Sequence, residues 1–148
     1  MTDYELMSKQ LLSLSEGVGW DITILSNAAG LLWDSLEDIN WAGFYIARGG
    51  RLCLGPFQGK PACTLIDFGK GVCGTAAAED RTQLVPDVHA FPGHIACDSA
   101  SRSEIVVPIH SGGALYGVLD IDSPLLGRFT EEDRDGLEVF VRTLETIL

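Results

Sequence analysis

The stretch EIVVPIHSGGALYGVLDID, residues 104–122, contains two apolar segments separated by a glycine-rich turn. Both segments, 104–110 and 114–122, are rich in β-branched and aliphatic residues, a composition typical of buried strands. The Ser-Gly-Gly sequence between them supplies the backbone freedom that a tight connection requires. This stretch therefore predicts an antiparallel hairpin, and the rest of the chain is interpreted around it.

The length of the turn sets which residues of the hairpin face one another. If Ser-Gly-Gly forms the whole turn, His110 pairs with Ala114, and Glu104 then pairs with Asp120. Pro108 limits which ladder hydrogen bonds form, so a register shifted by two residues is also open. In either register the acidic side chains of the two strands come close together.

Three carboxylates are expected to converge on this patch: Glu104, Asp120 and Asp122. The two aspartates share a face, because alternate side chains of a strand point the same way. Like charges packed closely raise the pKa of at least one of the acids, which places a proton donor beside anions. Such a patch can also hold an ammonium group. The alternative interpretation is an ordinary solvated face of the sheet.

Signals for helices and strands along the rest of the chain indicate an α+β fold. Helices are predicted over 3–15, 21–36 and within 69–80, and strands over 39–47, 51–57 and 81–88. Thr130, with Asp133 at the capping-box position, predicts the start of a C-terminal helix. Consecutive hairpins make the sheet mainly antiparallel, and helices from both chain ends must cover it.

Composition narrows the class of protein. A chain of 148 residues with 46% hydrophobic content is expected to form one domain, residues 1–148. Its net charge of −11 argues against a nucleic-acid partner, because phosphates would be repelled. No segment approaches the ~20 apolar residues of a membrane span, and the acidic N-terminus is unlike a signal peptide. These features predict a cytoplasmic protein without membrane association.

Two aromatic residues mark the first strand. Trp41, Gly43 and Tyr45 share a face of this strand, since they are two residues apart. Aromatic rings on either side of a glycine are expected to leave a slot. Ordinary packing of aromatic residues in a core is the alternative, and the aromatic residues alone favour it.

The four cysteines of the chain have different surroundings. In the cytosol they are expected to be reduced, catalytic or metal-bound rather than structural disulfides. Cys53 alternates with leucines in a strand and is expected to lie in the core. Cys63 lies in a loop, and Cys73 at the start of a helix, where a thiolate would be favoured. Cys97 lies in a long loop close to His94 and leads towards the acids.

Zinc is the alternative explanation for these thiols. A zinc site would draw on Cys63, Cys73, His89, His94 and Cys97. Their spacings lack the paired short knuckles that are usual for structural zinc. No metal or other cofactor is therefore expected.

Several long segments resemble the free methionine-(R)-sulfoxide reductases, a single-domain GAF family. They are INWAGFYI, LGPFQGKPAC, GKGVCGTAA, VPDVHAFPGHIACDSASRSEIVVPI and GVLDIDSP. The similarity extends from about residue 20 to residue 148. The family fold, a central antiparallel sheet with helices packed against it, agrees with the predicted order of elements.

The resemblance implies a role for each of the residues singled out above. It implies that Cys97 is the catalytic cysteine, Cys63 the resolving cysteine and Cys73 an auxiliary thiol. It further implies that Trp41 and Tyr45 form the wall around the substrate methyl group. The family's substrate-binding acids correspond to Glu104, Asp120 and Asp122.

The implied reaction explains why these residue types belong together. A neutral carboxylic acid would protonate the sulfoxide oxygen, and the Cys97 thiolate would attack the sulfur and become a sulfenic acid. Cys63 would condense with it to a disulfide, which thioredoxin would reopen in a response to oxidative stress. Backbone N–H groups around Asp98 and Ser99 would hold the substrate carboxylate.

A sensor function is the alternative of a different class. GAF domains are commonly ligand-binding modules, but a sensor needs an output domain or a coupled partner, and it has no need for three cysteines at these positions. A sensor binds its ligand without consuming a thiol, whereas a reductase loses two thiols in each turnover. Because GAF domains often pair through helices, a homodimer is favoured over a monomer.

Overall fold

The computed structural model describes residues 2–95 and 98–148, so the predicted nucleophile Cys97 lies outside the described residues. The elements, in chain order, are α1 (Tyr4–Leu14), α2 (Asp21–Ser35), β1 (Trp41–Arg48), β2 (Arg51–Gly59), β3 (Leu65–Asp67), α3 (Gly71–Glu79), β4 (Gln83–Val85), the 3₁₀ helix η1 (Val88–Ala90), β5 (Ser103–Ser111), β6 (Ala114–Ser123) and α4 (Glu131–Glu145). In this described part of the chain, none of the helices is long and apolar enough to cross a membrane.

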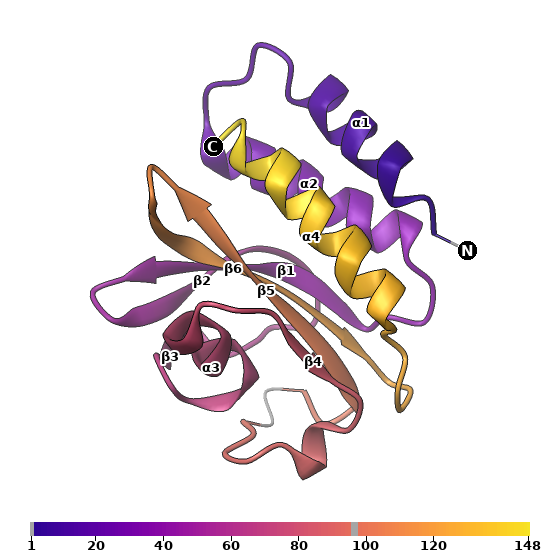
Figure 1. The fold of residues 1–148 in the computed structure, drawn as a ribbon, viewed down its shortest axis with the longest axis vertical. Helices are drawn as coiled ribbons and strands as arrows, with labels where there is room; N and C mark the ends of the chain where they lie inside the picture. Colours follow the sequence, from indigo (N-terminus) through magenta and orange to yellow (C-terminus); the bar gives the residue numbers. More distant parts are fainter. Residues whose placement is uncertain (1, 96–97) are drawn as a thin grey trace.

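Six strands form one antiparallel sheet in the order β3-β2-β1-β6-β5-β4. The longer strands β1, β6 and β5 lie in its middle, and Figure 1 shows β5 and β6 running diagonally across the molecule. The short elements β3 and η1 were not predicted, because three residues carry too little periodicity to reveal a strand or a helical turn.

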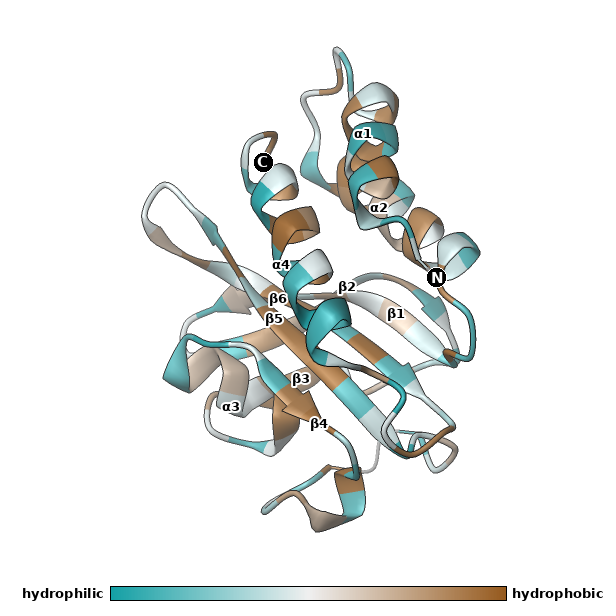
Figure 2. Cartoon of the chain, turned by 45° about the vertical axis from the view of Figure 1, so that its right-hand side comes forward, coloured by the Kyte–Doolittle hydropathy of each residue, from teal (hydrophilic) through white to brown (hydrophobic). Residues whose placement is uncertain are grey.

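Helices α1, α2 and α4 gather on one face of the sheet (Figure 1). α2 and α4 contact the strands directly, and α1 packs on α2 and α4. Alternate apolar side chains of the central strands fill the space beneath them: Ala42, Phe44, Ile105, Val107, Ile109, Leu119 and Ile121. Figure 2 shows this concentration of hydrophobic residues along the middle strands. The predicted α+β fold, an antiparallel sheet covered by N- and C-terminal helices, is confirmed.

The intervening residues of the same strands point to the opposite face, which α3 covers. A second apolar cluster forms there from Trp41, Tyr45, Leu52, Val72, Cys73, Ala76, Val106 and Val118. The sheet thus separates two cores, one under the terminal helices and one under α3. The acidic residues of the hairpin belong to the α3 face, because they alternate with residues of the helix-covered core.

The register of the β5–β6 hairpin differs from the expectation that Glu104 pairs with Asp120. In the structure Glu104 pairs with Asp122, and Val106 pairs with Asp120. Part of the shift arises because the turn contains two residues, both glycines with positive φ (60° and 79°), so that Ser111 pairs with Ala114. The rest comes from a bulge after Ile109. The alternative shifted by two residues was the right one.

The start of α4 agrees with the predicted capping box. The Thr130 hydroxyl accepts a hydrogen bond from the backbone N–H of Asp133 (3.2 Å), and the Asp133 carboxylate accepts one from the Thr130 N–H (2.9 Å). The same carboxylate accepts a hydrogen bond of 2.6 Å from the Tyr4 hydroxyl and lies 3.2 Å from Arg128 Nη1. The N-terminal helix is thereby tied to the C-terminal one through a single side chain.

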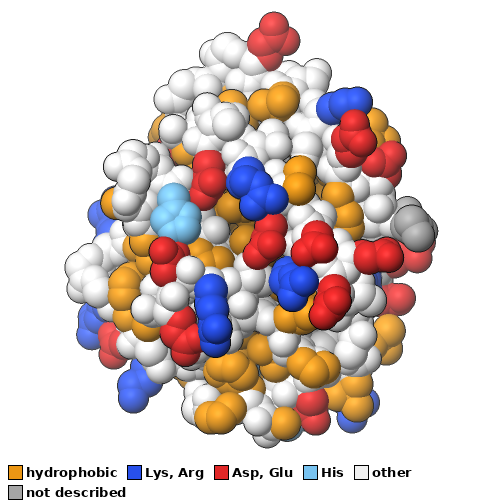
Figure 3. Space-filling model, viewed as in Figure 1, with side chains coloured by type: hydrophobic (Ala, Val, Ile, Leu, Met, Phe, Trp, Pro, Cys, Tyr) orange, Lys and Arg blue, Asp and Glu red, His pale blue; other side chains and the backbone are white. Residues whose placement is uncertain are grey.

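Charges on the surface alternate in sign over the face seen in Figure 3, where acidic and basic side chains lie side by side. Ion pairs such as Lys9–Glu5 and Arg81–Glu79 are exposed, so each is expected to contribute only ~0–1 kcal/mol. Not all of the acidic side chains take part in surface ion pairs, because some of the carboxylates lie inside the molecule.

Candidate active site

A pocket opens on the α3 face of the sheet and contains about 540 Å³, counting the space at its mouth. Its walls come from β1, β5, β6, the start of α3, and the segments that flank the sheet. The lining residues are Trp41, Tyr45, Pro61, Ala62, Ile66, Lys70, Gly71, Val72, Cys73, His94, Ile95, Asp98, Ser101, Glu104, Asp120 and Asp122.

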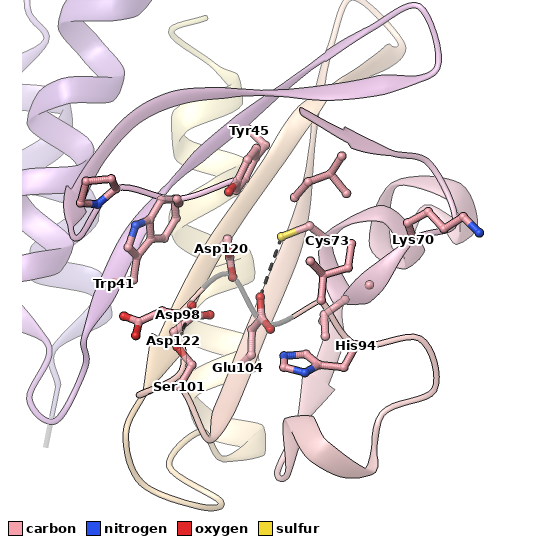
Figure 4. Close-up of a pocket in the computed structure, with 16 residues that line it drawn as sticks. Trp41, Tyr45, Lys70, Cys73, His94, Asp98, Ser101, Glu104, Asp120 and Asp122 are labelled. Carbon is pink, nitrogen blue, oxygen red and sulfur yellow. Dashed lines mark hydrogen bonds between the residues drawn. The ribbon is translucent and has the colours of Figure 1, made fainter. Parts of the chain in front are cut away.

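The three predicted acids meet in this pocket (Figure 4). Glu104 and Asp122 are cross-strand partners, and Asp120 lies two residues along β6 on the same face. Glu104 is 8% exposed and Asp120 is 5% exposed. Oδ1 of Asp120 and Oδ1 of Asp122 are buried, with no hydrogen-bond partner among the described residues. Buried acceptors without partners are costly, so this pocket is built to receive a donor.

Burial and mutual repulsion raise the pKa values of Glu104 and Asp122. The pKa of Glu104 is raised well above its ordinary value by burial and then by the charges of Asp120 and Asp122. Burial, followed by the charge of Asp120, likewise raises the pKa of Asp122. The site therefore holds a protonated carboxyl group beside an anionic one under conditions in which isolated acids would be ionised.

Cys73 lies in the first turn of α3 with its thiol against the acids. Its Sγ is 3.8 Å from Oε2 of Glu104, a contact marked by the dashed line in Figure 4. The prediction that this helix position favours a thiolate is wrong. Burial, followed by the charges of Asp120 and Glu104, raises the pKa of the Cys73 thiol well above its ordinary value, because removal from water and two acids outweigh the helix dipole.

Trp41 and Tyr45 form an aromatic wall opposite the thiol. The two rings stack with their centroids 5.8 Å apart, and Trp41 also stacks on Phe57 at 5.2 Å. The expected slot above Gly43 is filled, because a Cβ at this position would lie 2.3 Å from Cβ of Phe57. The glycine is needed for the close approach of β2, and the open space lies in front of the wall rather than between its rings.

Hydrogen bonds fix this wall in place. Trp41 Nε1 donates to the backbone carbonyl of Lys60 (3.0 Å), and the Tyr45 hydroxyl donates to the carbonyl of Cys63 (3.0 Å). Both rings are 2% exposed, so they are rigid parts of the second core as well as of the pocket. The segment that carries Cys63 is thus held against the aromatic wall.

Asn40 and Ser101 belong to the pocket's hydrogen-bond network, although neither was predicted from the sequence as a site residue. Asn40 Nδ2 donates to Oδ2 of Asp98 (3.0 Å) and to Oγ of Ser101 (3.1 Å). Ser101 Oγ donates to Oδ2 of Asp122 (3.2 Å). This chain of contacts joins the start of β1, the segment after residue 97 and the acids. Isolated polar residues at element ends carry no periodic signal that would have revealed it.

The remaining predicted residues fall in different places. His94 lines the pocket, and its pKa is lowered by burial and then by the nearby charge of His89, so the neutral imidazole is favoured. Cys97, the predicted nucleophile, lies outside the described residues. Cys53, expected in the core, is only half-buried on β2, where it pairs with Ile46.

Comparison with known proteins identifies relatives of this chain in sequence and in structure. Residues 10–148 match the GAF domain family. Free methionine-R-sulfoxide reductase of Escherichia coli (strain K12) is 50% identical, and the alignment covers 98% of this chain and 88% of that protein. The reduced form of fRMsr of Staphylococcus aureus superposes with a TM-score of 0.96 at 54% identity, over 100% of this chain and 96% of that one. Free methionine-R-sulfoxide reductase from Neisseria meningitidis, solved in complex with its substrate, gives a TM-score of 0.93 at 43% identity, over 97% and 87%.

The sheet order, the helices on its one face and the match over most of the chain define a GAF domain. The chain belongs to the GAF-domain family of enzymes that contains the free methionine-R-sulfoxide reductases. The resemblance drawn from the sequence motifs is confirmed by these matches along nearly the whole chain.

Proposed function

We propose that this enzyme reduces free L-methionine-(R)-sulfoxide to L-methionine. The observation that carries the proposal is the group of Glu104, Asp120 and Asp122, of which the first two are buried, facing an aromatic wall in one pocket. The acids offer both a proton for the sulfoxide oxygen and negative charge for an ammonium group. The relatives from Escherichia coli and Neisseria meningitidis are free methionine-R-sulfoxide reductases, which supports the same reaction.

The proposed reaction transfers two electrons from thiols to the sulfoxide. A protonated acid of the pocket hydrogen-bonds and then protonates the sulfoxide oxygen, which makes the sulfur electrophilic. The Cys97 thiolate attacks this sulfur, the oxygen passes to Cys97 as a sulfenic acid, and methionine is released. The Cys63 thiol then displaces water from the sulfenic acid and forms a disulfide. A dithiol protein of the thioredoxin type reopens this disulfide by exchange.

Substrate recognition in this proposal relies on charge and on the aromatic wall. The ionised acid of the cluster holds the substrate ammonium, and backbone N–H groups around Asp98 and Ser99 hold its carboxylate. Trp41 and Tyr45 contact the methyl group attached to sulfur. The raised pKa of Glu104 supports its role as proton donor, because a donor must remain protonated near neutral pH.

Thiol counting tests the reaction. The fully reduced enzyme is mixed with one equivalent of free methionine sulfoxide, with the R and S epimers in separate experiments. We expect two thiols to disappear and one methionine to form with the R epimer, and no change with the S epimer. Binding of the R epimer without loss of thiols would instead indicate a sensor.

Two cysteine variants divide the proposed roles. Cys97→Ser should form no methionine, because a hydroxyl at neutral pH is too weak a nucleophile. Cys63→Ser should release one methionine per chain and then stop. Continued turnover of Cys63→Ser with thioredoxin would show that Cys63 is not the resolving residue, and would assign that role to Cys73.

We further propose that the enzyme acts in the cytoplasm as a homodimer that pairs through its helices. Large apolar side chains exposed on or beside α1 and α2 support this pairing: Leu6, Leu12, Leu14, Trp20, Ile22 and Trp33. Such side chains on an outer helical layer are typical of an interface. Sedimentation equilibrium of the reduced protein should give twice the chain mass of 15.9 kDa, and a monomer mass would contradict the pairing.

A further inference from the structure

We propose that Cys73, Glu104 and Asp120 form a binding site for a thiophilic divalent cation, of which zinc is the natural example, and that the bound cation excludes the substrate. The cation is an inhibitor in this proposal and takes no part in turnover. The metal site itself goes beyond the proposed function, while its competition with the sulfoxide rests on that function.

The donor atoms of these three side chains already lie together. Sγ of Cys73 is 3.8 Å from Oε2 of Glu104, and one donor atom from each of the three residues lies within 4.8 Å of the others. Tetrahedral zinc with ordinary Zn–S and Zn–O bonds separates sulfur and oxygen by about 3.6 Å. Small side-chain rotations are therefore enough to complete three bonds to one cation.

Burial provides an independent sign that a cation or donor belongs here. Asp120 is 5% exposed and lines the pocket, yet its Oδ1 has no hydrogen-bond partner among the described residues. The buried Glu104 and the half-buried Asp122 lie beside Asp120 in the same pocket, and none of the described lysines or arginines forms an ion pair with the three acids. A divalent ion would satisfy the oxygen and offset the repulsion at once, as paired charges in protein interiors require.

The donor types select the cation. A thiolate favours zinc, cobalt or cadmium over magnesium and calcium, which prefer sites made only of oxygen ligands. With three protein ligands the fourth position is open to water or to another ligand from the pocket, which His94 and Asp122 also line (Figure 4). Binding replaces the thiol proton by the cation and releases that proton to the buffer.

The proposed cation and the proposed substrate would use the same acids. A cation bound to Glu104 and Asp120 removes the proton donor and the negative charge that an ammonium group requires. Sequence spacing gave no hint of this site, because its ligands come from α3, β5 and β6 and lie far apart along the chain. The zinc alternative considered from spacing used a different set, in which Cys73 was the shared member.

Cobalt(II) is the probe for the experiment, because thiolate coordination gives it a near-ultraviolet charge-transfer band. The titration uses the full chain carrying Cys63→Ser and Cys97→Ser, so that Cys53 and Cys73 are its remaining thiols. We expect one cobalt per chain, a thiolate band, and displacement by zinc. Adding Cys73→Ser should abolish the band and weaken binding at least tenfold, whereas adding Cys53→Ser should change neither.

Asp120→Asn provides a second variant that keeps the thiol and the size of the side chain. It should weaken cobalt binding at least tenfold while the band of any cobalt still bound persists. Near-ultraviolet circular dichroism of the metal-free variants checks that they are folded. A band that survives Cys73→Ser, or cobalt affinity unchanged in Asp120→Asn, would overturn the site.

Competition completes the test. Free methionine-(R)-sulfoxide should raise the apparent dissociation constant of cobalt in proportion to its concentration, since the Cys97→Ser background cannot turn it over. Cobalt affinity that is unaffected by saturating sulfoxide would overturn the shared site. Absence of sulfoxide reduction by the metal-free wild-type enzyme would instead contradict the proposed function, and the cobalt spectra would stand independently of it.

Discussion

The carboxyl group of Glu104 lies in the interior of the protein, and its burial makes the stability of the fold depend on pH. Burial, followed by the charges of Asp120 and Asp122, raises the pKa of its carboxyl group. The folded chain therefore binds this proton more tightly than the unfolded chain does. The resulting stabilisation is fully present below the unfolded value of about 4.3 and is lost as the pH rises towards the raised native value.

Glu104→Gln should remove sulfoxide reduction and yet stabilise the fold as the pH increases. The amide fills the same space but does not ionise, so the variant escapes the loss of stability that affects the wild type. We expect the difference between the unfolding temperatures of variant and wild type to grow from about pH 5 to about pH 8. Differential scanning calorimetry at several pH values measures it.

The matched control is Glu16→Gln, since Glu16 is an exposed acid in the turn after α1. Its unfolding temperature should follow that of the wild type at every pH. If the Glu104→Gln difference stays constant over the range, Glu104 is not the group that holds a proton, and the raised pKa belongs to a neighbouring acid of the coupled cluster.

Asn40, which directly precedes β1, connects several elements of the fold around the pocket. Its amide hydrogen-bonds Asp98 and Ser101, and Ser101 donates to Asp122. These contacts fix the segment that follows the predicted nucleophile relative to the end of β6. The residue acts by positioning, since it is not among the residues that line the pocket.

Asn40→Ala should slow the first turnover while leaving the fold intact. Loss of two hydrogen bonds, each worth ~0.5–1.5 kcal/mol, predicts a decrease of roughly 5-fold to 160-fold in the single-turnover rate. Rapid-quench measurement of methionine release gives this rate. Asn27→Ala, an exposed position on α2, is the control and should match the wild type. Equal rates for the two variants would show that Asn40 does not position the reacting groups.

The hairpin of β5 and β6 shows which features of an element can be read from sequence. Alternation of apolar and acidic residues correctly predicts that Glu104, Asp120 and Asp122 share a face, because the period of a strand is fixed. The pairing partner was not fixed, since it depends on the number of turn residues and on the bulge after Ile109. These are properties of local backbone geometry that apolar patterning does not encode.

The same limit applies to the site as a whole. Composition and spacing single out the acids and the thiols, whereas Trp41 and Tyr45 taken alone favoured ordinary core packing, and the resemblance to a known family implied their role as a wall. Composition and spacing do not predict the surroundings of Cys73. The helix start suggested a thiolate, whereas burial against Asp120 and Glu104 raises the pKa of this thiol. Which side chains surround a residue is set by tertiary packing, and a linear pattern does not contain it.

At the scale of the whole molecule, Asp133 joins the two ends of the chain. Burial by itself would raise the pKa of this carboxyl, but the hydrogen bonds from Tyr4 and Thr130 and the charge of Arg128 outweigh it and hold the pKa below its usual value. The ionised form is thus favoured by folding. Its contribution to stability is present above the unfolded value of about 3.9 and is lost as the pH falls through the lowered native value.

Asp133→Asn should destabilise the protein by roughly 1–2 kcal/mol at neutral pH, the usual size of a lost helix cap. The loss should shrink at about pH 3, where the wild-type carboxylate begins to be protonated. Urea unfolding at the two pH values measures both. Asp135→Asn, an exposed acid on the same helix, should have little effect, and an equal loss there would mean that helix charge rather than this network is responsible.

The enclosure of the pocket between sheet and α3 also bears on substrate size. In the proposed function a free amino acid presents an ammonium group to the ionised acid of the cluster, whereas an N-acetylated one presents a neutral amide and leaves a buried charge unpaired. We expect kcat/KM for N-acetylmethionine sulfoxide to be at least a hundredfold lower than for the free R epimer, about 2.7 kcal/mol. Comparison of the two substrates under the same reductant tests this, and a ratio below about tenfold (~1.4 kcal/mol) would contradict recognition of the ammonium.

The two faces of the central sheet have a consequence for how such a protein changes over generations. Along β5, Ile105, Val107 and Ile109 pack in the core beneath the helices. On the intervening positions Glu104 lines the pocket, and Val106 packs in the apolar cluster under α3. Alternate residues of this one strand therefore serve the fold and the chemistry separately. A lineage can replace the pocket residues of this second face and acquire a new ligand while its fold persists, and a descendant that keeps the fold need not keep the reaction.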